Sequence, residues 1–196
     1  MRPPPLRRLR NHRTKERMNK FVLASLLLVV RLAIAADAQP SHVRNFGTVN
    51  ENLFRGGAPT DEALVELKAL GVKMVLDLRE DGSGRLEEKR KVEQLGIRYE
   101  HIPMRVMSAP RPADIEQALS LLLRDPNAKI YIHCLRGKDR TGTVIACYRI
   151  QHDGWDSRRA LAEAKDYGMS SLERAMQSFI LHFTPLSLST LAAPLN

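Results

Sequence analysis

The sequence predicts a single α/β domain of three layers, in which helices flank a central, mainly parallel sheet. Short apolar runs of strand length alternate along the chain with longer helical patterns, and this alternation is typical of βαβ crossovers. The 196 residues suffice for one hydrophobic core but not comfortably for two. A hydrophobic content of 43% is that of a folded domain rather than a disordered chain.

Four short runs are predicted to be strands, and each is followed by glycine, proline or a polar loop. The run at 73–78 is apolar almost throughout, as expected of a strand that is covered on both faces. In such a sheet, ligands are expected at the carboxyl ends of the strands. In chain order, the predicted strands are residues 52–55, which Gly56 and Gly57 close as a turn, 73–78, 97–102 and 129–133.

Six longer segments are predicted to be helices. Thr60 and Asp156 are suited to cap a helix N-terminus, and Gly71 and Gly96 each follow a helix end. The segment at 114–123 places its Ile, Ala and Leu residues on one face, as an amphipathic helix packed on a sheet does. In chain order, the predicted helices are residues 61–70, 85–95, 114–123, 141–152, 157–167 and 172–183.

The positive charge of the chain is concentrated at its N-terminus. Residues 1–38 contain nine Lys or Arg and two acidic residues, so they carry +7 of the total of +9. The remaining chain, at only +2, lacks the broad basic surface on which binding to duplex nucleic acid depends. We therefore expect no nucleic-acid partner.

The same N-terminal segment has the pattern of a secretory signal peptide. A basic region precedes an apolar run at 21–30, and small residues at 33–38 suit a cleavage site. Arg31 interrupts a run that is too short to span a bilayer, so no stable membrane span is expected after cleavage. We expect an exported protein, periplasmic or secreted, although Met18 is an alternative start. The predicted divisions are a signal peptide (1–38), a linker (39–48), a folded domain (49–185) and a C-terminal tail (186–196).

The segment that carries chemistry lies between the strand at 129–133 and the next helix. It reads His-Cys-Leu-Arg-Gly-Lys-Asp-Arg-Thr-Gly over residues 133–142. Backbone N–H groups and a helix N-terminus converge at such a junction, which favours a bound anion. Gly137 removes a side chain where the loop turns tightly. The segment therefore predicts a phosphate-binding loop.

Cys134 and Arg140 are separated by five residues, a spacing that lets the backbone curl round a tetrahedral dianion. Arg140 can bind two phosphate oxygens, and the positive surroundings should lower the pKa of the Cys134 thiol. The thiolate can then attack phosphorus, and Thr141 can donate a hydrogen bond to the sulfur when it leaves. This two-step mechanism needs no cofactor, and the scattered histidines lack the spacing of metal ligands.

At His133, Cys134, Arg140 and Thr141 the chain resembles the protein tyrosine and dual-specificity phosphatase superfamily. Its signature is His-Cys, five residues, Arg, then Ser or Thr, and the resemblance to small exported bacterial members covers about residues 45–183. It implies the three-layer phosphatase fold. It also implies that His133 orients the loop, that Cys134 forms the phosphoenzyme and that Arg140 clamps the phosphate. The remaining substrate-binding residues would be Leu135, Arg136, Gly137, Lys138 and Thr141.

The general acid departs from the family pattern. Such enzymes usually carry an aspartate on the loop before the helix that precedes the signature, but residues 104–112 contain no carboxylate. We favour Asp139, because a leaving oxygen held by the loop lies within its reach. Asp139 would otherwise orient Arg140 or a neighbouring loop. Asp81 and Asp114 are the alternative acids, and Asp114 also suits the first turn of a helix.

The expected substrate is a phosphorylated protein, with phosphotyrosine or dual specificity. A phosphorylated small molecule or lipid is the alternative, and a second phosphate contact from Lys138 would favour phosphoinositides or inositol phosphates. Two further interpretations stay open: a pseudophosphatase that binds phosphate without turnover, and a rhodanese-like sulfurtransferase. We expect a monomer, and we expect Cys134 and Cys147 to be free thiols because two turns of helix would separate them too far for a disulfide.

Overall fold

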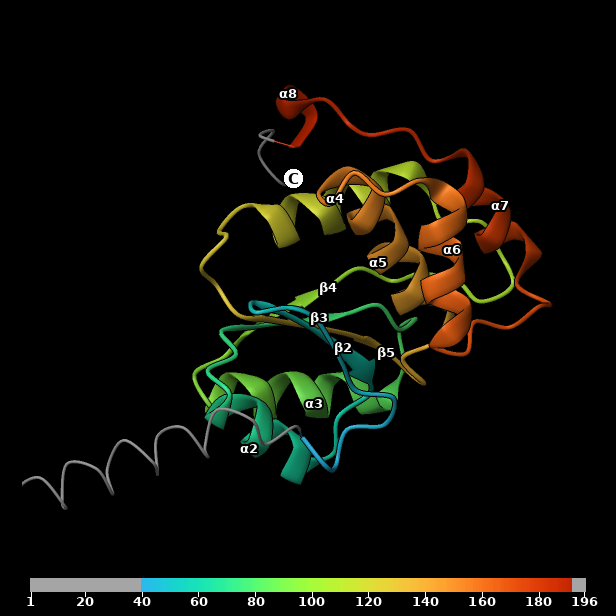
Figure 1. Cartoon of the computed structure of the whole chain (residues 1–196). Coiled ribbons are helices and arrows are strands. Elements are labelled where there is room, and N and C mark those ends of the chain that lie inside the picture. Colours follow the sequence, from blue (N-terminus) through green and yellow to red (C-terminus); the bar gives the residue numbers. More distant parts are fainter. Residues whose placement is uncertain (1–39, 192–196) are drawn as a thin grey trace, which may run out of the picture. The chain divides into compact units, whose positions relative to one another are not determined.

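The computed structural model describes residues 40–191, and its central sheet confirms the predicted α/β class (Figure 1). Five strands follow the order β1-β2-β5-β3-β4, in which β1 is antiparallel to β2 and all other neighbours are parallel. The parallel strands therefore end at one edge of the sheet. The strands are β1 (Gly47–Asn50), β2 (Leu53–Gly57), β3 (Met74–Asp77), β4 (Arg98–His101) and β5 (Ile130–Cys134).

Helices cover both faces of the sheet (Figure 1). One face packs against α2 and α3, and the other packs against α4 and α5. The helices α6 and α7 cover α5 from outside and enclose a third apolar cluster with it. The helices are α2 (Asp61–Ala69), α3 (Ser83–Gln94), α4 (Pro112–Leu123), α5 (Asp139–Gln151), α6 (Ser157–Asp166), α7 (Arg174–His182) and α8 (Leu188–Leu191).

The central strands β3 and β5 are buried along their whole length. Val75 and Tyr131 face the cluster formed with α2 and α3, whereas Leu76 and Ile132 face the cluster formed with α4 and α5. Successive side chains of a strand point to opposite faces, so both parities must be apolar here. This explains the nearly unbroken apolar run at 73–78.

The N-terminal part of the domain differs from the prediction. Residues 39–48 were expected to be a linker, but Val43 is buried in the core and β1 begins at Gly47. The turn expected at Gly56 and Gly57 is also wrong, because both residues continue β2 and pair with β5. Only glycine fits at position 56, because a Cβ there would collide with Tyr131 and Val43.

The predicted signal peptide lies outside the described residues, as do residues 192–196. The beginning of the predicted tail is described: Leu186 and Leu191 are half-buried against the core cluster of α4 and α5. Within residues 40–191, none of the helices has both the length and the apolar character that crossing a bilayer would require.

Candidate active site

The loop after β5 forms a tight turn against the end of β2. Cys134 is the last residue of β5, and α5 begins at Asp139. Gly137 lies between them with a φ of 71°, a conformation that side chains other than glycine rarely adopt. A Cβ on Gly137 would lie within 2.6 Å of the Gly56 carbonyl oxygen and the Gly57 nitrogen. The close backbone approach thus fixes the path of the loop.

Two side chains from the N-terminal part of the domain hold this turn, one from the segment before β1 and one from β2. The Gly137 carbonyl accepts hydrogen bonds from Asn45 Nδ2 at 2.9 Å and from Arg55 Nη2 at 3.0 Å. The Arg55 side chain is fully buried and its guanidinium lies 3.8 Å from the centre of the Tyr167 ring. Burial lowers the pKa of Arg55 to about 10, so it remains charged at neutral pH. A positive charge therefore lies beneath the phosphate loop.

The Cys134 thiol is buried and its pKa is lowered. Burial alone would raise the pKa, but Thr141, Arg140 and the Arg136 backbone N–H stabilise the thiolate and outweigh it. The Thr141 hydroxyl is buried and has no other hydrogen-bond partner within residues 40–191. It is therefore available to donate a hydrogen bond to the thiolate. Cys134 is thus prepared as a nucleophile.

Cys134 lines a hollow of about 190 Å³. Arg140 is buried in its wall and donates from Nη1 to the Met104 carbonyl at 3.3 Å, which ties the phosphate loop to the segment before α4. The hollow is lined by Val106, Met107, Cys134, Leu135, Arg136, Asp139, Arg140 and Glu173.

The predicted substrate-binding residues divide into two groups. Leu135 and Arg136 line the hollow, whereas Gly137 and Thr141 are buried and do not line it. Lys138 does not line the hollow, and the end of its side chain packs beside Gly168. The structure therefore gives no support to a second phosphate contact from Lys138.

The predicted general acids lie in different places. Asp139 lines the hollow, and its Oδ1 accepts the Ser170 N–H at 2.8 Å, which matches the alternative role of holding a neighbouring loop. Asp81 and Asp114 line a separate hollow of about 570 Å³ that does not include Cys134. Asp114 is moreover paired with Arg111 in the first turn of α4. Asp81 and Asp114 thus do not line the hollow beside Cys134.

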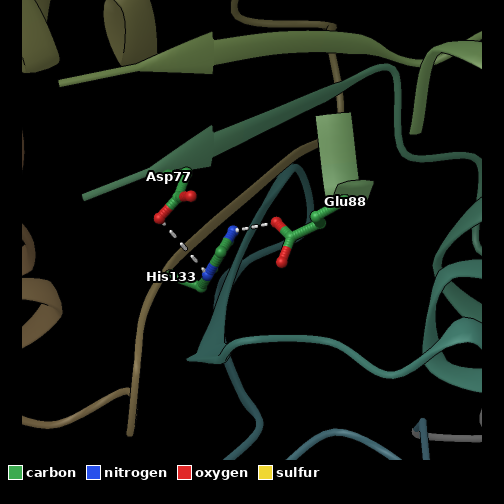
Figure 2. Close-up of side chains that lie close together, drawn as sticks. All are labelled: Asp77, Glu88 and His133. Atoms are coloured by element: carbon green, nitrogen blue, oxygen red, sulfur yellow. Dashed lines mark ion pairs between the residues drawn. The ribbon is translucent and has the colours of Figure 1, made fainter. Parts of the chain in front are cut away.

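A buried charge network supports the residue before the nucleophile. His133 Nε2 lies 2.9 Å from Glu88 Oε1, and its Nδ1 lies 3.8 Å from Asp77 Oδ1 (Figure 2). Arg79 pairs with both carboxylates, and Tyr99 donates to Asp77 Oδ2 at 2.6 Å. The three ligand-type atoms lie within 4.8 Å of one another, as a metal site would require. Because Arg79 and a protonated His133 together balance the two carboxylates, we interpret the cluster as an ion-pair network.

This network shifts two pKa values in a consistent direction. Burial alone would lower the pKa of His133, but the hydrogen bond and charge of Glu88 raise it overall. Burial alone would raise the pKa of Asp77, but His133, Arg79 and Tyr99 lower it to about 2. The imidazolium and the Asp77 carboxylate therefore stabilise each other in the folded state.

Replacing Glu88 by glutamine is expected to cost about 3 kcal/mol of unfolding free energy at pH 6, because it leaves a buried imidazolium without its nearest partner. A raised folded pKa gives stability that is complete below the ordinary value of 6.5 and is lost as the pH rises through the folded value. The loss in Glu88→Gln should thus shrink toward pH 9. Urea unfolding of both proteins at pH 6 and pH 9 checks this, and an equal loss at both values would contradict it.

Five supporting residues were not found from the sequence. They come from segments remote from the phosphate loop, so no local spacing connects them with Cys134. Arg55 carried a detectable signal, since it is a charged residue inside a strand whose neighbours are apolar or glycine. Glu88 lies in a helix rich in charge and carried none. The five are Asn45, Arg55, Asp77, Glu88 and Glu173.

Comparisons with known proteins agree with this geometry. A family model described as DSP-PTPase phosphatase fused to NAD+ kinase matches residues 43–182. Inositol diphosphatase DSP3 of Arabidopsis thaliana is 32% identical over 152 residues, which cover 74% of this chain and 72% of that protein. Dual specificity protein phosphatase TpbA of Pseudomonas aeruginosa is 30% identical over 131 residues, covering 63% of this chain and 55% of TpbA.

Solved structures show the same fold. The crystal structure of P. aeruginosa TpbA superposes with a TM-score of 0.62 at 25% identity, covering 73% of this chain and 86% of that one. The catalytic core of the PP-IP phosphatase SIW14 from S. cerevisiae gives a TM-score of 0.65 at 25% identity, covering 74% and 89%. Together with the loop built on Cys134 and Arg140, the family match shows that this chain belongs to the dual-specificity and tyrosine phosphatase (DSP-PTPase) family.

Proposed function

We propose that the protein hydrolyses aryl phosphate monoesters, with phosphotyrosine in proteins as the substrate class, through a phosphocysteine intermediate. The substrate assignment rests on the apolar side chains at the rim of the hollow beside Cys134. Val106, Met107 and Leu135 line this hollow and are 47%, 60% and 55% exposed. Large apolar side chains left exposed together at a site favour an apolar ligand group. An aromatic ring next to the phosphate fits this rim.

The charges of the hollow argue against a ligand with many phosphates. Two arginines, Arg136 and Arg140, line it together with two carboxylates, Asp139 and Glu173. One phosphate dianion satisfies the cations, whereas further phosphates would meet acidic groups and apolar side chains. The relatives named inositol diphosphatases make inositol phosphates the competing substrate class.

A substrate panel tests this proposal. We expect a phosphotyrosine peptide to exceed both a phosphoserine peptide and an inositol diphosphate in kcat/KM, by roughly tenfold to hundredfold, because an apolar contact of this size contributes about 1–3 kcal/mol. Phosphate release is measured for each substrate at equal concentration. An inositol diphosphate that is hydrolysed fastest would replace the proposed substrate class and leave the phosphatase assignment standing.

We also propose that the protein is exported and acts in the periplasm or outside the cell. The support is the basic and apolar pattern of residues 1–38 and the small residues at 33–38. N-terminal sequencing of the protein recovered from outside the cytoplasm should find a new terminus after Ala35 or Ala38. A mature protein that begins at residue 1 or at Met18 would refute cleavage.

A further inference from the structure

We propose that Glu173 is the general acid and base of the reaction, an inference that rests on the phosphatase function proposed above. A phenol or alcohol leaves a phosphate ester more easily when a positioned group protonates its oxygen. The loop at 104–111, between β4 and α4, contains no carboxylate to do so. Another segment must therefore supply the proton.

Glu173 lies in the right place. It immediately precedes α7, its side chain is 5% exposed, and it lines the same hollow as Cys134 and Arg140. Its carboxylate accepts the Met107 N–H, at 3.0 Å to Oε2 and 3.3 Å to Oε1. Within residues 40–191 it forms no salt bridge with Lys, Arg or His. A buried carboxylate without a cationic partner is uncommon.

The loop is bent toward this carboxylate. Met107 has a φ of 55°, which is unusual for a residue other than glycine and costs about 1 kcal/mol. The conformation directs its N–H to Glu173. A hydrogen bond therefore joins Glu173 to the loop at 104–111, which has no carboxylate of its own. Backbone strain of this kind concentrates at functional sites.

In-line geometry favours Glu173 over Asp139. The leaving oxygen departs from the side of phosphorus opposite the Cys134 sulfur, while the loop surrounds the equatorial oxygens. Asp139 follows Lys138 directly in that surrounding loop, at the start of α5. Among the residues that line the hollow, Glu173 is the carboxylate that comes from outside the loop. Glu173 is therefore the lining carboxylate that can reach the leaving oxygen without belonging to the phosphate loop.

The two chemical steps balance through this one proton. The Cys134 thiolate forms the S–P bond as the P–O bond to the leaving group breaks, and the Glu173 carboxyl gives its proton to the departing oxygen. Water then attacks phosphorus and transfers a proton to the Glu173 carboxylate as the S–P bond breaks. Inorganic phosphate, the thiolate and the protonated Glu173 are restored together.

The test is the dependence of Glu173→Gln on the leaving group. The phenol of phosphotyrosine has an ordinary pKa of about 10 and needs a proton on departure, whereas nitrophenolate leaves without one. We expect Glu173→Gln to lose about 10²- to 10³-fold in kcat/KM on a phosphotyrosine peptide and less than about tenfold on an activated nitrophenyl phosphate. The fall of the wild-type rate at high pH, where the acid loses its proton, should disappear in the variant.

The retained rate on the activated ester shows that Glu173→Gln is folded. Asp166→Asn, an amide replacement at the exposed end of α6, is the matched control and should keep the wild-type dependence on both substrates. An equal loss on both substrates would overturn the proposal and make Glu173 a positioning residue for the Met107 loop. The proposal would also be overturned if Asp139→Asn, and not Glu173→Gln, showed this dependence on the leaving group. Inactivity of the wild-type protein on every substrate would instead refute the proposed function.

Discussion

Replacing Cys134 by serine is expected to lower kcat/KM on an aryl phosphate by about four orders of magnitude or more. The site is built for a thiolate: Thr141 and Arg140 overcome the cost of burial and lower the pKa of the thiol. A serine hydroxyl in the same place stays protonated and attacks phosphorus poorly. Phosphate release over time measures the loss, and phosphate bound covalently to wild-type protein after an acid quench should be missing from the variant.

Cys147 offers a matched control for this change. It is the other free cysteine, is buried in α5, and burial raises the pKa of its thiol. It does not line the hollow beside Cys134. Cys147→Ser should cost about 1–3 kcal/mol of unfolding free energy by burying a hydroxyl, yet keep the catalytic rate of the folded enzyme. A Cys134→Ser protein within a hundredfold of wild type would show that the nucleophile has been assigned wrongly.

Gly137→Ala is expected to destabilise the domain by about 3 kcal/mol and to abolish most of its activity. An alanine would pay about 1–2 kcal/mol for the φ of 71°, and its Cβ would press on the backbone of Gly56 and Gly57. Relief of that collision must move the loop, so the Arg140 guanidinium and the backbone N–H groups would lose their alignment on phosphate. Urea unfolding and kcat/KM on an aryl phosphate measure the two effects.

Gly154→Ala is a control that separates the cost of a positive φ from the cost of a steric clash. Gly154 has a φ of 67°, but a Cβ there would meet no atom within 4 Å. This variant should therefore lose only about 1–2 kcal/mol of stability and should retain near-wild-type activity. Similar losses of activity in both variants would mean that the close approach between the loop and β2 does not control catalysis.

The sequence was sufficient where the determining residues are close together in the chain. The phosphate loop is a continuous segment, in which Cys134 ends β5, Arg140 lies in the first turn of α5 and both line one hollow. The runs that became β3 and β5 were recognisable because strands buried on both faces must be apolar throughout. The Thr60 cap of α2 was predicted correctly for the same local reason, since its hydroxyl accepts the Ala63 N–H.

Local patterns failed where the fold joins remote segments. β1 has only four residues and is an edge strand, so it has no alternation long enough to recognise. Gly56 and Gly57 looked like a turn, but their absent side chains serve close packing inside β2. Between the loop at 104–111 and Glu173 the chain forms α4, β5, α5 and α6. Only tertiary packing brings Glu173 to Met107.

The support of the Gly137 carbonyl also has a consequence for how the enzyme comes into being. Asn45 and Arg55 reach that carbonyl across 92 and 82 residues of chain, and β2 has β5 as its parallel neighbour. Contacts between residues so far apart in the chain form late in folding, because the entropic cost of closing the intervening loop must be overcome first. In a half-folded chain the turn at Gly137 therefore lacks these two hydrogen bonds, and the loop around the thiolate gains this support only when the two ends of the domain have met.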